Sequence, residues 1–297
     1  MRKMFVVRPT FFWKRLPNRN TAAKEHRMKP EDVVNLDLYP ITEQESPECK
    51  ALIARLKREL EENQYVSLPD FIRPEAREKA VADALAALPS AHHNSSNRNC
   101  YLQRSGDPAL PDDHPRNIML EASTRMLAYD RFPDDCPVKT LYHWAPVRDM
   151  VAGIVGSETL YDNEDPCQPV NLLCYQTGDR SAWHFDSVNA FTMTLMLQAS
   201  EAGGDFEIVP HTRSDDDQNY DYVRRVLTGQ CAEDAVSVAR AAGSLCIFRG
   251  CNSLHRVSPV EGDAMRIMGV FVYEREPGVV GDPEVNATVY GRDCAPA

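Results

Sequence analysis

Three residues with metal-ligating side chains stand out in the second half of the sequence: His184, Asp186 and His255. In an extended segment, residues i and i+2 face the same side, so His184 and Asp186 can reach one ion together. A third ligand must come from elsewhere, and His255 lies in residues 253–257, a predicted late strand. Two imidazoles and one carboxylate that leave coordination positions open are typical of mononuclear non-haem Fe(II) sites. The alternative for each histidine is a hydrogen-bonded structural residue.

A cation placed eleven residues after His255 adds a second kind of chemistry. Arg266 lies in the otherwise apolar run 265–273, where a guanidinium is costly to bury unless it is paired. Its fork of donors fits a carboxylate bidentately, so an anionic ligand in the same pocket is the natural partner. The alternative is a salt bridge to an internal Asp or Glu.

The chain also resembles a known family in the order and kind of its residues. Over about residues 165–275 it resembles the iron(II)/2-oxoglutarate-dependent dioxygenase superfamily. The resemblance is carried by the ligand set and the later arginine, by a glycine turn that leads into a strand, and by an apolar strand before the distal histidine. These are His184-x-Asp186, His255, Arg266, Gly-Gly-Asp-Phe-Glu-Ile-Val-Pro (203–210) and Leu-Cys-Ile-Phe (245–248).

The resemblance implies an α+β protein with a double-stranded β-helix (jelly-roll) core, a helical N-terminal half packed on it, and the metal at the mouth of the barrel. It also implies that Arg266 binds the distal carboxylate of the co-substrate 2-oxoglutarate, whose keto acid end chelates Fe(II). The implied reaction uses O2 to oxidise a C–H bond and releases CO2 and succinate.

Two departures from the family pattern concern the co-substrate. Some relatives carry a serine two residues after the arginine, but this chain has Met268, so another hydroxyl must share the carboxylate. Tyr175 occupies a place where some relatives keep a tyrosine for this task. Thr192 and Thr194 share strand parity with the first two ligands and are further candidates, although β-propensity alone also explains a strand threonine.

Asp186 bears on the type of reaction. Halogenating relatives replace this carboxylate with a small residue so that chloride can bind, so its presence favours hydroxylation, desaturation or oxidative cyclisation. The patterns around the ligands (183–186, 192–198, 203–207 and 254–262) also resemble a sub-group that acts on small amino-acid-type molecules and includes aziridine-forming oxygenases. The expected substrate is therefore a small molecule of amino-acid metabolism.

Candidate substrate contacts come from a long polar segment and from the neighbours of His184. Arg104 and Arg116 could anchor a substrate carboxylate, although solvated loop charges are the alternative. Trp183 and Phe185 could wall the pocket or pack in the core. Two other functions remain open: a prolyl-type protein side-chain hydroxylase, favoured by an open groove beside the iron, and a cupin-like metal-binding module, which would have no need for Arg266.

The charge distribution restricts the partners. The net charge is −11, yet nine of the 33 Lys and Arg residues and only one of the 44 acids lie in residues 1–29. The remainder is strongly acidic and repels phosphate backbones, so nucleic acid is not expected as a partner. We interpret residues 1–29 as a poorly ordered arm. No apolar run is long enough for a membrane span. The nine scattered cysteines, without a C-x-x-C pair, predict reduced thiols and a cytoplasmic protein, and the oligomeric state stays open.

The predicted elements change character along the chain. Helices are expected at 46–63, 73–88 and 145–155, with a short extended stretch at 65–68 and a long loop at 89–117. Short strands then follow, interrupted by a helical insertion near 217–228. One domain is therefore expected over 30–297, with helical support and a substrate loop in 30–165 and the jelly-roll core in 166–297. The predicted strands are 170–177, 191–198, 204–209, 235–240, 244–248, 253–258 and 265–273.

Overall fold

The computed structural model describes residues 28–186, 191–292 and 294. The expected arm, residues 1–29, therefore lies almost wholly outside the described residues, and its separation from a single domain stays a prediction. Within the described part, two antiparallel sheets form the core of an α+β jelly roll. The larger sheet has seven strands and the smaller one four, and both line one cavity.

The strand order follows the jelly-roll pattern, with neighbours in a sheet that are far apart in sequence. The larger sheet runs β1-β11-β7-β14-β5-β3-β2 and the smaller β10-β9-β12-β6, beside the two-stranded pairs β13-β8 and β15-β4. The strands are β1 (Tyr65–Leu68), β2 (His92–Arg98), β3 (Leu120–Leu127), β4 (Tyr161–Asp162), β5 (Val170–Tyr175), β6 (Ser181–His184), β7 (Thr192–Gln198), β8 (Ala202–Gly203), β9 (Phe206–Val209), β10 (Val236–Val238), β11 (Leu245–Phe248), β12 (Leu254–Val257), β13 (Val260–Glu261), β14 (Arg266–Phe271) and β15 (Tyr273–Glu274).

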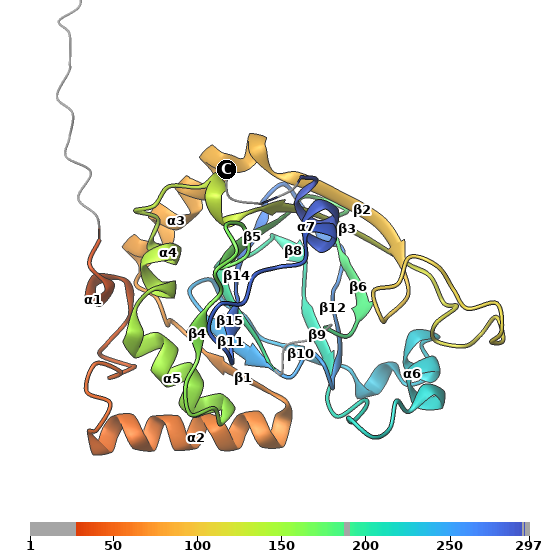
Figure 1. The fold of residues 1–297 in the computed structure, drawn as a ribbon, viewed down its shortest axis with the longest axis horizontal. Helices are drawn as coiled ribbons and strands as arrows, with labels where there is room; N and C mark the ends of the chain where they lie inside the picture. The colour runs from red at the N-terminus through yellow and green to blue at the C-terminus, as the bar shows by residue number, and fades with distance from the viewer. Residues whose placement is uncertain (1–27, 187–190, 293, 295–297) are drawn as a thin grey trace, which may run out of the picture.

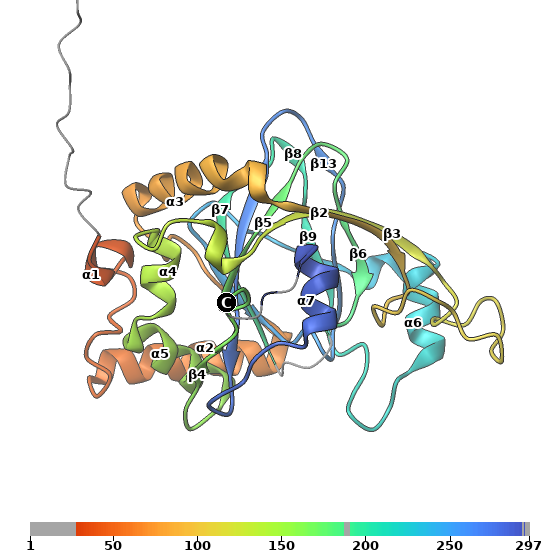
Figure 2. The ribbon, with the colours of Figure 1, turned by 45° about the horizontal axis from the view of Figure 1, so that its top comes forward.

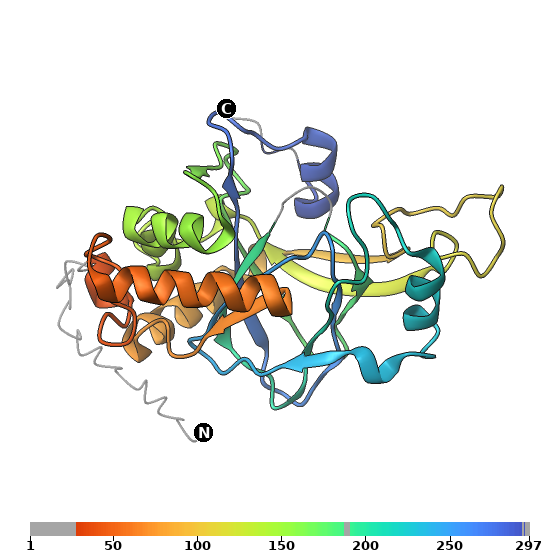
Figure 3. The same ribbon diagram turned by 90° about the horizontal axis from the view of Figure 1, so that it is seen from below.

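Helices α1, α2, α3, α4 and α5 lie together on one side of the larger sheet, and α6 lies on the opposite side of the molecule (Figure 1). Helix α7 lies beside β2 and β3, as the turned view shows (Figure 2). The loop between β2 and β3, residues 99–119, projects next to α6 (Figure 3). The helices are α1 (Pro30–Val33), α2 (Pro47–Asn63), α3 (Pro74–Ala87), α4 (Pro137–Tyr142), α5 (Ala145–Val155), α6 (Tyr220–Leu227) and α7 (Pro283–Tyr290).

Strand alternation separates an apolar face of the larger sheet from a face that carries polar groups. On β7, Met193, Leu195 and Leu197 join the main hydrophobic core with the helices. The alternate residues Thr192 and Thr194 line the cavity between the sheets. The same alternation recurs on β5 and β14, so one set of strands both anchors the helices and presents side chains to the cavity.

Most of the predicted elements are confirmed, with one clear difference. The expected helices correspond to α2, α3, α5 and α6, and Ser46 caps α2 by accepting a hydrogen bond from the Cys49 amide at 3.1 Å. Residues 92–98, expected within a loop, instead form β2, which pairs with β3 (Leu120–Leu127). The segment is polar on both faces, so no hydrophobic alternation signalled a strand.

The prediction that every cysteine is a reduced thiol is wrong for two of them. Cys167 and Cys294, 127 residues apart, form a disulfide. Tertiary packing brings the segment after α7 against the entry to β5, a proximity that scattered spacing could not indicate. Among the described residues, no helix combines the length and apolar character that crossing a membrane requires.

Candidate metal centre and its cavity

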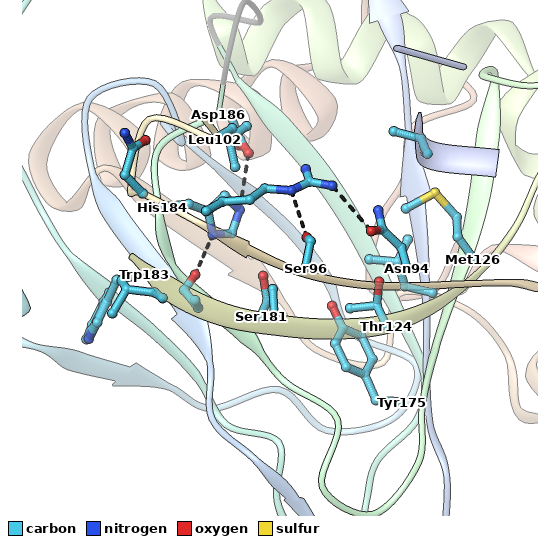
Figure 4. Close-up of a pocket in the computed structure, with 17 residues that line it drawn as sticks. Asn94, Ser96, Leu102, Thr124, Met126, Tyr175, Ser181, Trp183, His184 and Asp186 are labelled. Atoms are coloured by element: carbon cyan, nitrogen blue, oxygen red, sulfur yellow. Dashed lines mark hydrogen bonds and ion pairs between the residues drawn. The ribbon is translucent and has the colours of Figure 1, made fainter. Parts of the chain in front are cut away.

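His184, Asp186 and His255 converge on one point, as their spacing predicted. His184 ends β6, His255 lies on β12, and the two residues are directly opposite each other in the ladder. The Nε2 atoms of His184 and His255 lie 3.7 and 3.6 Å from Asp186 Oδ1. One ligand atom from each of the three side chains fits within a 4.8 Å span, which is the separation that a shared ion requires. His184 and Asp186 are seen side by side in Figure 4.

Backbone carbonyls orient both imidazoles. Nδ1 of His184 lies 2.7 Å from the carbonyl oxygen of Ala182, and Nδ1 of His255 lies 3.0 Å from that of Ser253. A proton on each Nδ1 makes these hydrogen bonds and leaves the Nε2 lone pairs facing Asp186. Both rings therefore present the tautomer that a metal ion needs.

The charge states of the ligands also suit a cation. Burial, followed by the neighbouring His255, lowers the pKa of His184 to about 4, which keeps the imidazole neutral. Burial alone would raise the pKa of Asp186, but His255, His184 and a hydrogen bond from Thr192 together lower it. A neutral imidazole beside an ionised carboxylate is a donor set that binds a divalent metal.

Two contacts hold the Asp186 carboxylate in place. The Thr192 hydroxyl donates a hydrogen bond to Oδ2. A Cβ added to Gly250 would lie 1.9 Å from the same oxygen, so only glycine leaves room for it. The Asp186 amide also donates to the Gly250 carbonyl at 3.1 Å. Thr192 therefore contacts a metal ligand, and its expected role in binding the co-substrate stays a prediction.

The metal ligands lie where two lobes of one cavity meet. We call the lobe between the two sheets the inner lobe; it measures about 230 Å³ and reaches Thr194 and Arg240 at its deep end. The outer lobe measures about 200 Å³ and runs under β2 and β3. Tyr175, like His184 and Asp186, lines both lobes.

Arg266 lies behind the inner lobe, in an adjoining hollow that Arg240 also lines, next to Tyr175 and Met268 of the lobe itself. Its role in binding the co-substrate stays a prediction. Only 1% of the residue is exposed, and its Nε and Nη1 have no hydrogen-bond partner among the described residues. Tyr175 is its cross-strand neighbour, with the ring centre 5.1 Å from the guanidinium, and Met268 Sδ lies 3.7 Å from Nη2. The salt bridge considered as the alternative is not formed within the described part of the chain. The donors are free for an anionic ligand.

A second arginine, Arg240, lines the inner lobe, is partly buried, and was missed by the sequence reasoning. It follows β10 and donates a hydrogen bond to the Thr194 hydroxyl. Its neighbours in sequence, Ala239 and Ala241, form no motif, and only the packing of the 239–244 turn against β7 brings it into the cavity. No signal in the sequence pointed to it.

Arg98 on β2 was also missed, and it lines the outer lobe together with His184 and Asp186. Its Nε donates to Ser96 Oγ at 2.9 Å and its Nη2 to Asn94 Oδ1 at 3.3 Å. These two partners lie on the same strand face and belong to the outer lobe (Figure 4). Burial, together with Arg104, lowers the pKa of Arg98. The alternation of polar residues on β2 could have signalled an inward polar face, had the strand been recognised.

The structure does not bring the predicted anchors Arg104 and Arg116 to the metal cavity. Arg104 is exposed, and Arg116 donates to the Tyr220 hydroxyl at 3.3 Å. The Arg116 guanidinium also lies 5.8 Å from the centre of the Tyr101 ring. Both belong to the loop 99–119, which turns away from the metal to pack on α6.

The two aromatic neighbours of His184 differ. Phe185 is buried away from the cavity, 5.6 Å from the Tyr101 ring and beneath the Arg213 guanidinium, because alternate residues of an extended segment face opposite sides. Its expected substrate contact is not supported. Trp183 borders the outer lobe, but its ring turns away from His184 and lies 4.6 Å from the Arg256 guanidinium.

No curated protein matches the chain in sequence. Among the solved structures that resemble the chain, three show the fold at low sequence identity. The 2-oxoglutarate-dependent carbocyclase SnoK of nogalamycin biosynthesis is 14% identical with a TM-score of 0.52, and the match covers 74% of this chain and 83% of SnoK. The epimerase SnoN, in complex with Fe3+, alpha ketoglutarate and nogalamycin RO, is 16% identical with a TM-score of 0.50, covering 83% of this chain and 96% of SnoN. A prolyl hydroxylase of Trichoplax adhaerens in complex with a peptide fragment is 15% identical with a TM-score of 0.50, covering 76% of this chain and 90% of that one.

These likenesses confirm the jelly-roll fold of the 2-oxoglutarate-dependent oxygenases. The family model named Halogenase D matches residues 49–281, which is most of the chain. The chain belongs to the halogenase D family.

Proposed function

We propose that this chain is an Fe(II)- and 2-oxoglutarate-dependent oxygenase that oxidises a C–H bond of a small, carboxylate-bearing, amino-acid-like molecule. One observation carries the proposal. His184, Asp186 and His255 meet at a cavity, and in the hollow behind it lies the Arg266 guanidinium, whose Nε and Nη1 have no hydrogen-bond partner among the described residues. A metal site in this cavity and a carboxylate site at its back match a co-substrate that has a chelating keto acid at one end and a carboxylate at the other.

The protein's own part in this reaction is binding and orientation. Ferrous iron supplies the O2 and redox chemistry that side chains lack. The two imidazoles and Asp186 would hold the metal, and Arg266 and Tyr175 would hold and orient the far end of the co-substrate. Apolar side chains of the inner lobe, among them Phe248 and Val270, limit the entry of water.

Asp186 favours oxygenation over halogenation, although the family name suggests the latter. Its Oδ1 lies within 3.7 Å of both histidine Nε2 atoms, so it would take the coordination position that halogenating relatives leave to a halide. Thr192 and the space beside Gly250 hold the carboxylate there. Hydroxylation, desaturation and oxidative cyclisation all remain compatible with this ligand set.

The outer lobe supports a small substrate rather than a protein side chain. It is roofed by β2 and β3, and Val289 of α7 borders both lobes. Arg98 lines this lobe together with His184 and Asp186 and forms no ion pair with any of the described Asp or Glu residues, so a substrate carboxylate is its natural partner. Hydroxyl and amide groups of Asn94, Ser96 and Thr124 offer contacts for an amino group. This set suits the sub-group that acts on amino-acid-type molecules.

Besides the small-molecule oxygenase and the protein side-chain hydroxylase, the remaining alternative is a cupin-like metal-binding module without oxygenase activity. Such a protein has no use for a buried cation without a partner, and burying Arg266 unpaired lowers stability. The unpaired Nε and Nη1 of this residue therefore favour a ligand-binding enzyme.

Anaerobic titration with Fe(II) and 2-oxoglutarate tests the proposal. We expect a visible charge-transfer band between the keto acid and iron, and its loss at the same co-substrate concentration in Arg266→Gln. Arg55→Gln is the matched control, because it removes an exposed guanidinium of α2 that pairs with Glu59, away from the cavity. Absence of the band in the unmodified chain would refute the proposal. Stimulation of succinate release in a screen of amino acids would then identify the substrate.

A further inference from the structure

Two arginines lie close together in the hollow behind the inner lobe, Arg266 fully buried and Arg240 partly buried. Arg240 comes from the turn between β10 and β11, and Arg266 from the start of β14. Each has an Nε and an Nη1 that are inaccessible to solvent and have no hydrogen-bond partner among the described residues. Both border the same hollow behind the lobe, and Arg240 also lines the lobe itself.

The charges of Arg240 and Arg266 favour the binding of an anion between them. No ion pair joins either guanidinium to an Asp or Glu in the described part of the chain, although the charge of Asp205 acts on Arg266, and both guanidiniums are desolvated. Burial is the main cause that lowers the pKa of both, to about 10 for Arg266, and the charge of Arg240 lowers that of Arg266 further. Two neighbouring cations that no ion pair neutralises are unfavourable in a low-dielectric interior. A bound carboxylate would relieve both.

The arrangement of groups along β7 relates this pair to the metal. Thr192 donates to the ligand Asp186, and Thr194, two residues further along, accepts from Arg240. Two residues of a strand span about 7 Å. Arg240 thus lies one strand repeat deeper than the metal ligand, on the face that carries the cavity. A short dicarboxylate with one end at the metal would place its other end among Arg240, Tyr175 and Arg266.

We propose that Arg240 is a second guanidinium that, together with Arg266, holds the distal carboxylate of the co-substrate and makes the site selective for 2-oxo dicarboxylates over 2-oxo monocarboxylates. This inference rests on the function proposed above. Two guanidiniums together provide enough N–H donors to satisfy both oxygens of one carboxylate. A second arginine would therefore replace the hydroxyl that some relatives supply from a serine, where this chain has Met268. The Thr194 hydroxyl positions Arg240 by accepting one of its donors.

Isothermal titration calorimetry of the full chain, loaded with Fe(II) under anaerobic conditions, measures the Kd values that test this selectivity. The two probes are 2-oxoglutarate and 2-oxovalerate, which has the same five-carbon chain but no distal carboxylate. We expect Arg240→Gln to raise the Kd for 2-oxoglutarate by about tenfold to a hundredfold, as for loss of a charge-assisted hydrogen bond, and to leave the Kd for 2-oxovalerate unchanged. Arg240→Lys keeps the charge but loses the fork, so its loss should be smaller. Arg55→Gln should match the unmodified chain for both probes.

The outcomes separate this inference from the proposed function. If the unmodified chain does not bind 2-oxoglutarate, the proposed function fails and the inference falls with it. If Arg266→Gln loses binding while Arg240→Gln binds as tightly as the unmodified chain, the function stands and the inference is overturned. Equal loss of both probes in Arg240→Gln would show a structural role and also overturn it. If Arg240→Gln does not fold, as judged by its circular dichroism, Arg240→Lys and Thr194→Val decide by the same selectivity ratio.

Discussion

The two lobes of the cavity are built from different kinds of structure. The inner lobe lies between strands whose ladders on both sides set the position of each side chain, and it is lined by the three candidate metal ligands and Tyr175, with Arg266 directly behind it. The outer lobe is roofed by the β2–β3 pair at the edge of the larger sheet, next to a long loop. Under the proposed function, the groups that would bind the co-substrate lie on the strands of the core, and those that would contact the substrate lie at its margin, where sequence can vary at less cost to stability.

Removal of the carboxylate ligand should have the largest effect on the inner lobe. In Asp186→Ala we expect Fe(II) affinity to fall by more than about a hundredfold, because loss of the groups that merely support a metal ligand already costs about 10- to 100-fold. Equilibrium competition with a metal chelator measures this. Glu207→Ala, on the opposite face of the smaller sheet and paired with Arg256, is the control. Unchanged Fe(II) affinity in Asp186→Ala would remove this residue from the metal site.

Crowding of that carboxylate should have the next largest effect. In Gly250→Ala the new methyl group meets Asp186 Oδ2, so we expect Fe(II) affinity to drop about 10- to 100-fold in the same competition. At Gly229 an added Cβ meets no atom within 4 Å, although its φ of +76° makes alanine unfavourable by about 1 kcal/mol. Gly229→Ala should therefore lose some stability but no Fe(II) affinity. A similar Fe(II) affinity in the two variants would contradict the close contact at Gly250.

A change in the outer lobe should act on the substrate alone. With the amino acid that most stimulates succinate release, we expect Arg98→Gln to raise the substrate KM about tenfold or more, since a buried charged hydrogen bond is lost, and to leave the KM for 2-oxoglutarate unchanged. Arg104→Gln, on the same chain segment but exposed, is the matched control. A rise in the KM for 2-oxoglutarate as well would show that the two lobes are not separate in function.

The smallest effect on the site should come from the far face of the same sheet. Leu195 on β7 is buried against the helices, so Leu195→Ala should lower the free energy of unfolding by about 2–5 kcal/mol through the cavity it leaves. Chemical denaturation measures that loss. The Kd of the folded variant for 2-oxoglutarate should change less than twofold, because the side chain points away from the inner lobe. A large change in this Kd would show that the two faces are coupled.

Features that follow a local pattern within one strand or helix were predictable from the sequence, and features at the cavity margin were not. The ligand pair His184 and Asp186 was predictable because alternation along a strand is local, and Arg266 because a charge inside an apolar run is conspicuous. The same alternation should have excluded Phe185, which faces the opposite side. The helices were predictable from their caps and apolar faces, and β2 was not, because a polar cavity face carries no hydrophobic signal.

The sequence by itself determined the metal ligands, the later arginine and the class of fold, since these depend on spacing within single strands and on their order. Only the tertiary structure decided which further side chains meet them. Arg240 and Arg98 reach the cavity from a turn and an edge strand, Arg104 and Arg116 turn away with their loop, and Cys167 meets Cys294 across the fold. Such contacts depend on how distant segments pack, which no local pattern encodes.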